Sequence, residues 1–141
     1  MALEPYLRAA VIGAVSGLRT FTPAGALFAG GSRWAWPSLL LAAGELLGDK
    51  LPMTPSRVSL LPLLARAAAG GWSGRAVARE FGGSSSAGAA FGAATAVGAA
   101  WLGYGLRSYL TKQRRLPDFP VALVEDAIAI FAARAVTRRA R

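Results

Sequence analysis

The chain of 141 residues contains no cysteine and no histidine. Disulfide bonds and thiolate chemistry are therefore excluded, and the redox compartment cannot be read from the sequence. Zinc and haem sites depend largely on these two residue types, so we expect no metal and no cofactor. Nucleophile–base pairs that use histidine or cysteine are excluded too, and no glycine-rich stretch carries the lysine of a phosphate-binding loop. The sequence therefore favours a protein that is not an enzyme.

Acidic residues are also scarce, with seven against 16 lysines and arginines, which gives a formal charge of +9. Only 16% of the residues are charged and 54% are hydrophobic, whereas a soluble domain usually carries about 25% charged residues. Such a basic chain could bind nucleic acid, but its cations gather where apolar runs end, as at residues 112–115 and 138–141. This pattern is typical of a membrane protein whose cations meet anionic lipid headgroups. We therefore predict a multi-pass protein of the plasma membrane that binds no nucleic acid.

The first half of the chain predicts two helical segments. Residues 7–32 are apolar apart from Arg8 and Arg19, and about 20 residues span a bilayer core. Pro23 would clash with the carbonyl of Arg19 in a continuous helix, so we expect the helix to end near Thr22 and a shorter piece to run through Phe28. A second helix is expected from Pro37 to residue 48 or 49.

The second half of the chain predicts two short helical pieces followed by two longer helices. Residues 58–69 are too short to span and favour a half-helix or a re-entrant piece, and the more polar stretch from Trp72 favours a helix lying at the membrane interface. A loop is expected at 82–86. Residues 87–106 form an uncharged span with small residues at intervals of four, which lets helices approach closely. A basic loop at 107–118 and a last helix at 119–136 follow.

These segments predict an all-α fold, a small polytopic membrane bundle with broken or re-entrant helices in a single domain, residues 1–141. Glu4 and Pro5 stand where a signal peptide would have a basic region, so no cleavable leader is expected. The motif GLR occurs at 17–19 and again at 105–107. It suggests two inverted repeat halves, 1–70 and 71–141, with a chance match as the alternative. The small-residue helix favours a homo-oligomer.

Arg19 is the first candidate site residue, because an arginine within an apolar span costs a few kcal/mol unless it faces a partner or a cavity. One interpretation is an anion clamp, in which the guanidinium binds a carboxylate or phosphate. The alternative is a static salt bridge to Glu45, Asp49 or Glu125. In either case we expect Arg19 inside the bundle within reach of a carboxylate, with Glu45 or Glu125 favoured.

The segment 44–57 is the second candidate region. Glu45 and Asp49 are four residues apart and would face the same way on a helix. Burial and mutual repulsion would suit such a pair to carrying a proton or binding a cation. The alternative places Asp49 and Lys50 at the membrane interface, with Asp49 capping the next turn.

Glu125 and Asp126 form the other acidic pair and lie inside the last apolar segment. Adjacent residues point about 100° apart on a helix. One is therefore expected to face the interior and the other an arginine such as Arg134 or Arg107. We predict Glu125 as the inward one.

The segments GLRTFTP, GELLGDKLPMTPSR and ALVEDAIAI together resemble a family of membrane proteins, the domain of unknown function numbered 4126. The resemblance covers most of the chain, and DKLPMTPSR is its most specific part. It implies a membrane location but no reaction. Its motifs mark one set of positions here: 17–19, 49–52, 55–57 with Arg57, Arg66, and Glu125 with Asp126.

The sequence thus favours transport or permeation of a small solute or ion. Arg19 and Arg66 would engage an anionic group, while Glu45, Asp49 and Glu125 would handle a proton or a cation. The alternative is a membrane protein that does not transport but binds or organises anionic lipid. The binding residues predicted on either ground are Arg19, Glu45, Asp49, Lys50, Arg57, Arg66, Arg107, Glu125 and Asp126.

Overall fold

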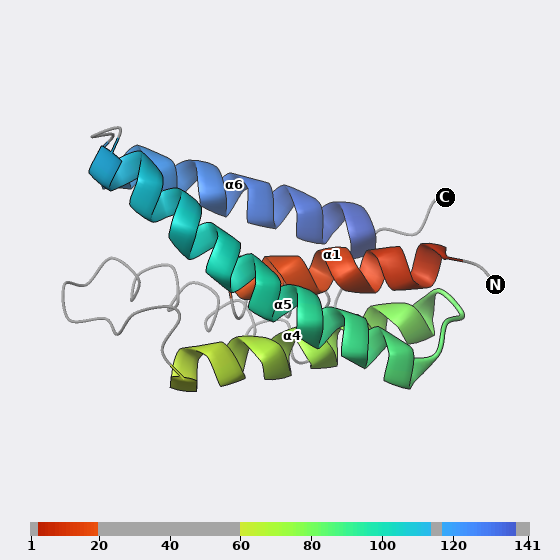
Figure 1. The fold of residues 1–141 in the computed structure, drawn as a ribbon. Helices are drawn as coiled ribbons and strands as arrows, with labels where there is room; N and C mark the ends of the chain where they lie inside the picture. The colour runs from red at the N-terminus through yellow and green to blue at the C-terminus, as the bar shows by residue number, and fades with distance from the viewer. Residues whose placement is uncertain (1–2, 20–59, 114–116, 138–141) are drawn as a thin grey trace, which may run out of the picture.

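The computed structural model describes residues 3–19, 60–113 and 117–137 (Figure 1). Within these residues the chain forms four α-helices and one π-helical turn, and no strand. The elements are α1 (Glu4–Leu18), α4 (Leu60–Glu80), α5 (Ser85–Ser108), η1 (Tyr109–Gln113) and α6 (Asp118–Thr137). The predicted all-helical class is therefore confirmed over the part of the chain that the structure describes.

Helices α1, α4 and α5 pack against one another through small residues. One face of α5 buries such residues at intervals of four: Gly88, Gly92, Ala96 and Ala100. A Cβ atom added to Gly92 would lie 2.9 Å from the carbonyl carbon of Gly70 and 3.0 Å from the Cα of Gly74 in α4. The predicted close contact of this helix is confirmed, and it lies within one chain. It therefore gives no argument for a contact between two copies.

The four described helices alternate in direction along the chain, so α1 and α5 are parallel. Gly13 and Gly17 of α1 meet α5 at Gly92 and Ala96, so the residue numbers rise together along the two helices. Helix α6 runs opposite to α1, since the guanidinium of Arg8 donates to the carbonyl of Val136. An inverted repeat would make the two GLR-bearing helices antiparallel. The parallel course of α1 and α5 does not support one.

Helix α4 is continuous, so the predicted division into a short piece at 58–69 and a separate helix from Trp72 is wrong. The Gly70–Gly71 pair lies inside it, although a glycine in a helix costs about 1 kcal/mol relative to alanine. A Cβ at Gly70 would come within 2.6 Å of the Ala96 side chain, so the absence of that atom permits the contact with α5. Ser73 and Val77 are fully buried, which a helix lying on the surface would not allow.

The ends of the helices also differ in part from the expectation. Helix α1 ends at Leu18 and Arg19 is extended, with φ −141° and ψ 114°. The break at Pro23 and the predicted helix at 37–49 lie outside the described residues. Helices α5 and α6 confirm the predicted spans within two residues, but residues 107–113 are helical rather than a loop. Continued i→i+4 and wider backbone bonding, including that of Tyr109 to Gly105, extends α5 through this basic segment.

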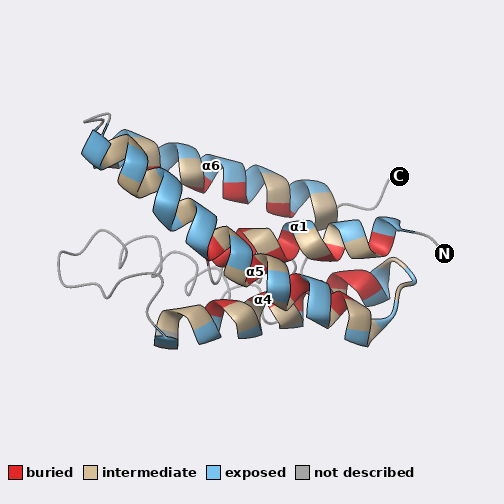
Figure 2. Cartoon of the chain, viewed as in Figure 1, coloured by how far each residue is buried: buried red, intermediate tan, exposed pale blue. Residues whose placement is uncertain are grey.

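The distribution of large and small side chains is the reverse of that in a soluble bundle. The buried apolar residues of the described chain are mostly alanines, while Leu102 and Phe131 are 77% and 74% exposed. Figure 2 shows buried residues on the facing sides of the helices and exposed ones along their outer sides. Among the described residues, one helical stretch, Ser85–Gln113, is long and apolar enough to cross a membrane, judged by length and composition.

Candidate functional site

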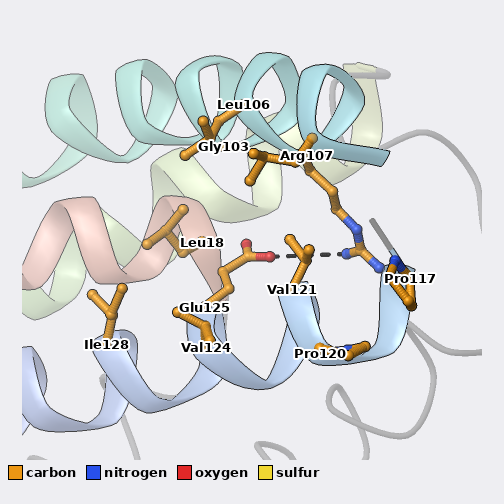
Figure 3. Close-up of a pocket in the computed structure, with 11 residues that line it drawn as sticks. Leu18, Gly103, Leu106, Arg107, Pro117, Pro120, Val121, Val124, Glu125 and Ile128 are labelled. Atoms are coloured by element: carbon orange, nitrogen blue, oxygen red, sulfur yellow. Dashed lines mark ion pairs between the residues drawn. The ribbon is translucent and has the colours of Figure 1, made fainter. Parts of the chain in front are cut away.

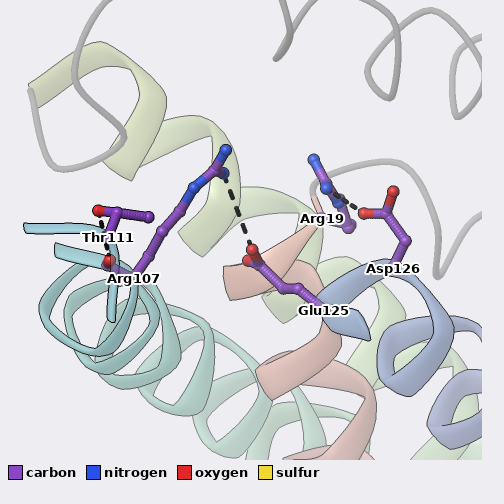
Figure 4. Close-up of polar contacts among 5 residues, drawn as sticks. All are labelled: Arg19, Arg107, Thr111, Glu125 and Asp126. Carbon is purple, nitrogen blue, oxygen red and sulfur yellow. Dashed lines mark hydrogen bonds and ion pairs between the residues drawn. The ribbon is translucent and has the colours of Figure 1, made fainter. Parts of the chain in front are cut away.

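The end of α1 brings a buried arginine against a carboxylate of α6. Arg19 is 1% exposed and is the largest of the fully buried side chains in the described chain. Its Nη2 donates to Oδ1 of Asp126, which is 9% exposed (Figure 4). The antiparallel course of α6 alongside α1 positions this aspartate at the point where α1 stops. The attraction between the two charges offsets the desolvation cost of burying each of them.

A second ion pair joins α5 to α6 through Glu125, the residue before Asp126. Nη1 of Arg107 lies 3.9 Å from Oε2 of Glu125. This is an ion pair too long for a direct hydrogen bond. The two side chains are 20% and 12% exposed. Since Glu125 and Asp126 point about 100° apart on α6, one helix holds an arginine from α1 on one side and an arginine from α5 on the other.

A cavity of about 430 Å³ lies beside the second pair (Figure 3). Leu18, the last residue of α1, lines it together with Gly103 of α5. Leu18 is the point at which α1 ends, and α5 and α6 continue past it along the cavity. Among the described residues of the lining, Arg107 and Glu125 are charged and the others are apolar: Leu18, Gly103, Leu106, Leu110, Pro117, Pro120, Val121, Val124 and Ile128.

Arg66 of α4 is the second buried arginine of the described chain, at 4% exposure. Its Nη1 lies 3.4 Å from the carbonyl oxygen of Pro62, one turn earlier. Gly70 meets α5 at Gly92 and Ala96, and α4 runs opposite to α5. Arg66 therefore lies one turn further toward the end of α1 that carries Arg19. The described arginines Arg19, Arg66 and Arg107 thus occur toward the same end of the bundle.

The structure brings together four of the predicted site residues as two pairs, but not with the expected partners. Asp126, rather than Glu125, bonds Arg19, and Glu125 faces Arg107. The prediction of Glu125 as the inward residue used its depth in the apolar segment. Partner choice depends instead on which helix lies on each side of α6, and a sequence pattern does not contain that information. Glu45, Asp49, Lys50 and Arg57 lie outside the described residues.

Sequence reasoning missed the cavity and the residues that form its floor. A Cβ added to Gly103 would lie 2.8 Å from Cδ2 of Leu18 and 3.9 Å from Oε1 of Glu125. Gly103 therefore makes room for both side chains. The available signal was Gly103, one turn before Arg107, among the large side chains of the stretch WLGYGLR.

The charged side chains of this site can bind an ion of opposite charge. No group of three or more histidine, cysteine, aspartate or glutamate side chains suited to a metal ion occurs within residues 3–19, 60–113 and 117–137. A guanidinium beside an apolar cavity can bind an anion.

No protein-family model, no curated protein and no solved structure matches the chain.

Proposed function

We propose that the chain is a multi-pass protein of the plasma membrane that transports a small solute or ion through the charged end of its helix bundle. Its large apolar side chains face outward and its small residues face inward, as expected of helices surrounded by lipid. Exposed apolar area of this extent is unusual on a soluble monomer. The likeness to the family of domain 4126 stays a prediction and agrees with this location.

The observation that carries the proposal is the unequal state of the two pairs on α6. The Arg19–Asp126 pair is buried and directly bonded, whereas the Arg107–Glu125 pair is separated by 3.9 Å and lines a cavity. Ionisable residues within a membrane usually mark a path for an ion or a solute. The first pair holds α6 against α1, and the second faces the cavity, where we place the exchange of a proton and an anion.

The exchange follows from charge balance at the second pair. A proton on Glu125 removes the negative charge that faces Arg107. An anion entering the cavity then supplies the counter-charge to the guanidinium. Loss of the proton restores the ion pair and releases the anion, so the proton and the anion move together.

This mechanism predicts anion-driven proton uptake by the purified chain in liposomes. The vesicles would contain a pH-sensitive dye and receive an inward gradient of nitrate, phosphate, methanesulfonate or butanesulfonate. We expect internal acidification with at least one anion. Glu125→Gln should slow it by about tenfold or more, because the titrating proton is lost while the shape is kept.

Glu4→Gln is the matched control. Glu4 pairs with Arg8 at the exposed start of α1, away from the cavity, and its loss should leave the flux unchanged. The proposal would be contradicted if vesicles containing the wild-type chain acidified no faster than protein-free vesicles with any of the four anions. Equal rates for wild type and Glu125→Gln would contradict the role of this carboxylate.

A further inference from the structure

We infer that the cavity at the end of α1 binds an amphiphilic anion, a single apolar chain with one anionic group such as a sulfonate, phosphate or carboxylate. The inference rests on the proposed function, since it names the class of solute that the same site takes. Its basis is the composition of the described lining: apolar side chains from α1, α5 and α6 surround one ion pair, whose cation is Arg107.

The apolar part of the site suits an alkyl chain. Leu18, Val121 and Ile128 line it from α1 and α6, and Leu106 and Leu110 line it from the α5–η1 side. Volumes of roughly 300–1,000 Å³ are typical of ligand sites that bury most of their ligand. A cavity of about 430 Å³ is at the small end of that range and suits one chain rather than a lipid with two.

The charge around the cavity favours an anion. Arg107 lines it, and Glu125 offsets that charge in the pair between α5 and α6. The connecting sequence from 107 to 118 carries Arg107, Lys112, Arg114 and Arg115 against one acid, Asp118. Lys112 is exposed at the end of η1. An anionic group at Arg107 is thus attracted by Lys112 as well, which lies in the last turn of the same continuous helical segment.

A chain-length series tests the inference directly. Labelled alkyl sulfonates from butyl to dodecyl would be bound to the chain in phosphatidylcholine nanodiscs, with empty nanodiscs subtracted. Affinity should rise about fourfold for each added methylene while the chain fills the cavity. It should then stop rising. Partition into lipid alone would rise without such a plateau, and that result would overturn the inference.

Two glycines of α5 provide a matched pair of variants. Gly103→Leu fills the floor of the cavity and should move the plateau to shorter chains. Gly105→Leu adds the same side chain two residues on, where a Cβ meets nothing within 4 Å, and should leave the plateau in place. Leu18→Ala should move it to longer chains, which keeps the test available if Gly103→Leu fails to fold. An unmoved plateau in both cavity variants would overturn the site.

Charge recognition is tested separately. Arg107→Gln should lower the affinity for octyl sulfonate about tenfold or more and leave octanol binding unchanged, since a charge-assisted bond is lost. Equal losses for both ligands would overturn the role of Arg107. Strong competition by phosphatidylglycerol in the nanodiscs would assign the cavity to bilayer lipid and overturn the inference as well. Nitrate flux with no chain-length plateau would refute this inference and leave the proposed function standing.

Discussion

Gly92→Ala should lower the free energy of unfolding by about 3 kcal/mol, at the upper end of the cost of overpacking a well-packed core. The added methyl group would meet the backbone of α4 at Gly70 and Gly74, with carbon atoms at 2.9 and 3.0 Å. Backbone atoms in two packed helices cannot rotate away as a side-chain tip can. The helices must therefore separate, and the contacts along the whole interface weaken with them.

Gly98→Ala is the control for this change. It lies six residues on in the same helix, and a Cβ there meets nothing within 4 Å. Its stability should stay unchanged or rise by up to about 1 kcal/mol, because alanine is the better helix former. Melting of both variants in the same detergent, followed by circular dichroism, gives the comparison. Similar melting temperatures for the two would refute the close α4–α5 contact.

Asp126→Ala should cost about 3–5 kcal/mol, the range found when one partner of a buried ion pair is removed. Arg19 would stay buried and lose the carboxylate that bonds it. The double variant Arg19→Met, Asp126→Leu should recover much of this loss, because neither charge is then buried. Chemical or thermal unfolding of the two variants and the wild type gives the comparison.

The exposed Glu4–Arg8 pair at the start of α1 provides the reference for the stability loss of Asp126→Ala. Glu4 lies 2.8 Å from Arg8, but its side chain is 65% exposed. Glu4→Ala should therefore cost less than about 0.5 kcal/mol. If Asp126→Ala were as mild as Glu4→Ala, the Arg19–Asp126 pair would not hold α6 to α1.

Helix existence could be predicted from the sequence because the apolar segments are long and uninterrupted. Helices α5 and α6 follow this rule. Helix α4 does not, because Gly70 and Gly71 weaken a helix in isolation and yet permit its closest tertiary contact. Local propensity and packing thus give opposite answers at these two residues, and only the neighbouring helix decides between them.

The candidate site, too, could be predicted in part from the sequence and depends in part on tertiary packing. The sequence alone indicates that Arg19 and the 125–126 pair are too costly to bury without partners. It cannot say which acid meets which arginine, because a rotation of α6 by one residue would exchange them. The cavity was beyond prediction for a similar reason, since its described lining depends on how α1, α5 and α6 lie relative to one another.

The bond from Arg8 to the Val136 carbonyl, at 2.9 Å, places the start of α1 and the end of α6 together. In a bilayer, reporters fused before α1 and after α6 should therefore report the same compartment, and one inserted at 114–116 the opposite one. If α6 crosses the membrane as proposed, the basic sequences before and after it, 112–115 and 138–141, belong to opposite sides. Their effects on orientation oppose each other, so the usual bias toward a positive cytoplasmic side is weak. A single lysine added at either end of α6 should shift the fraction of chains inserted each way, as dual reporter fusions would measure.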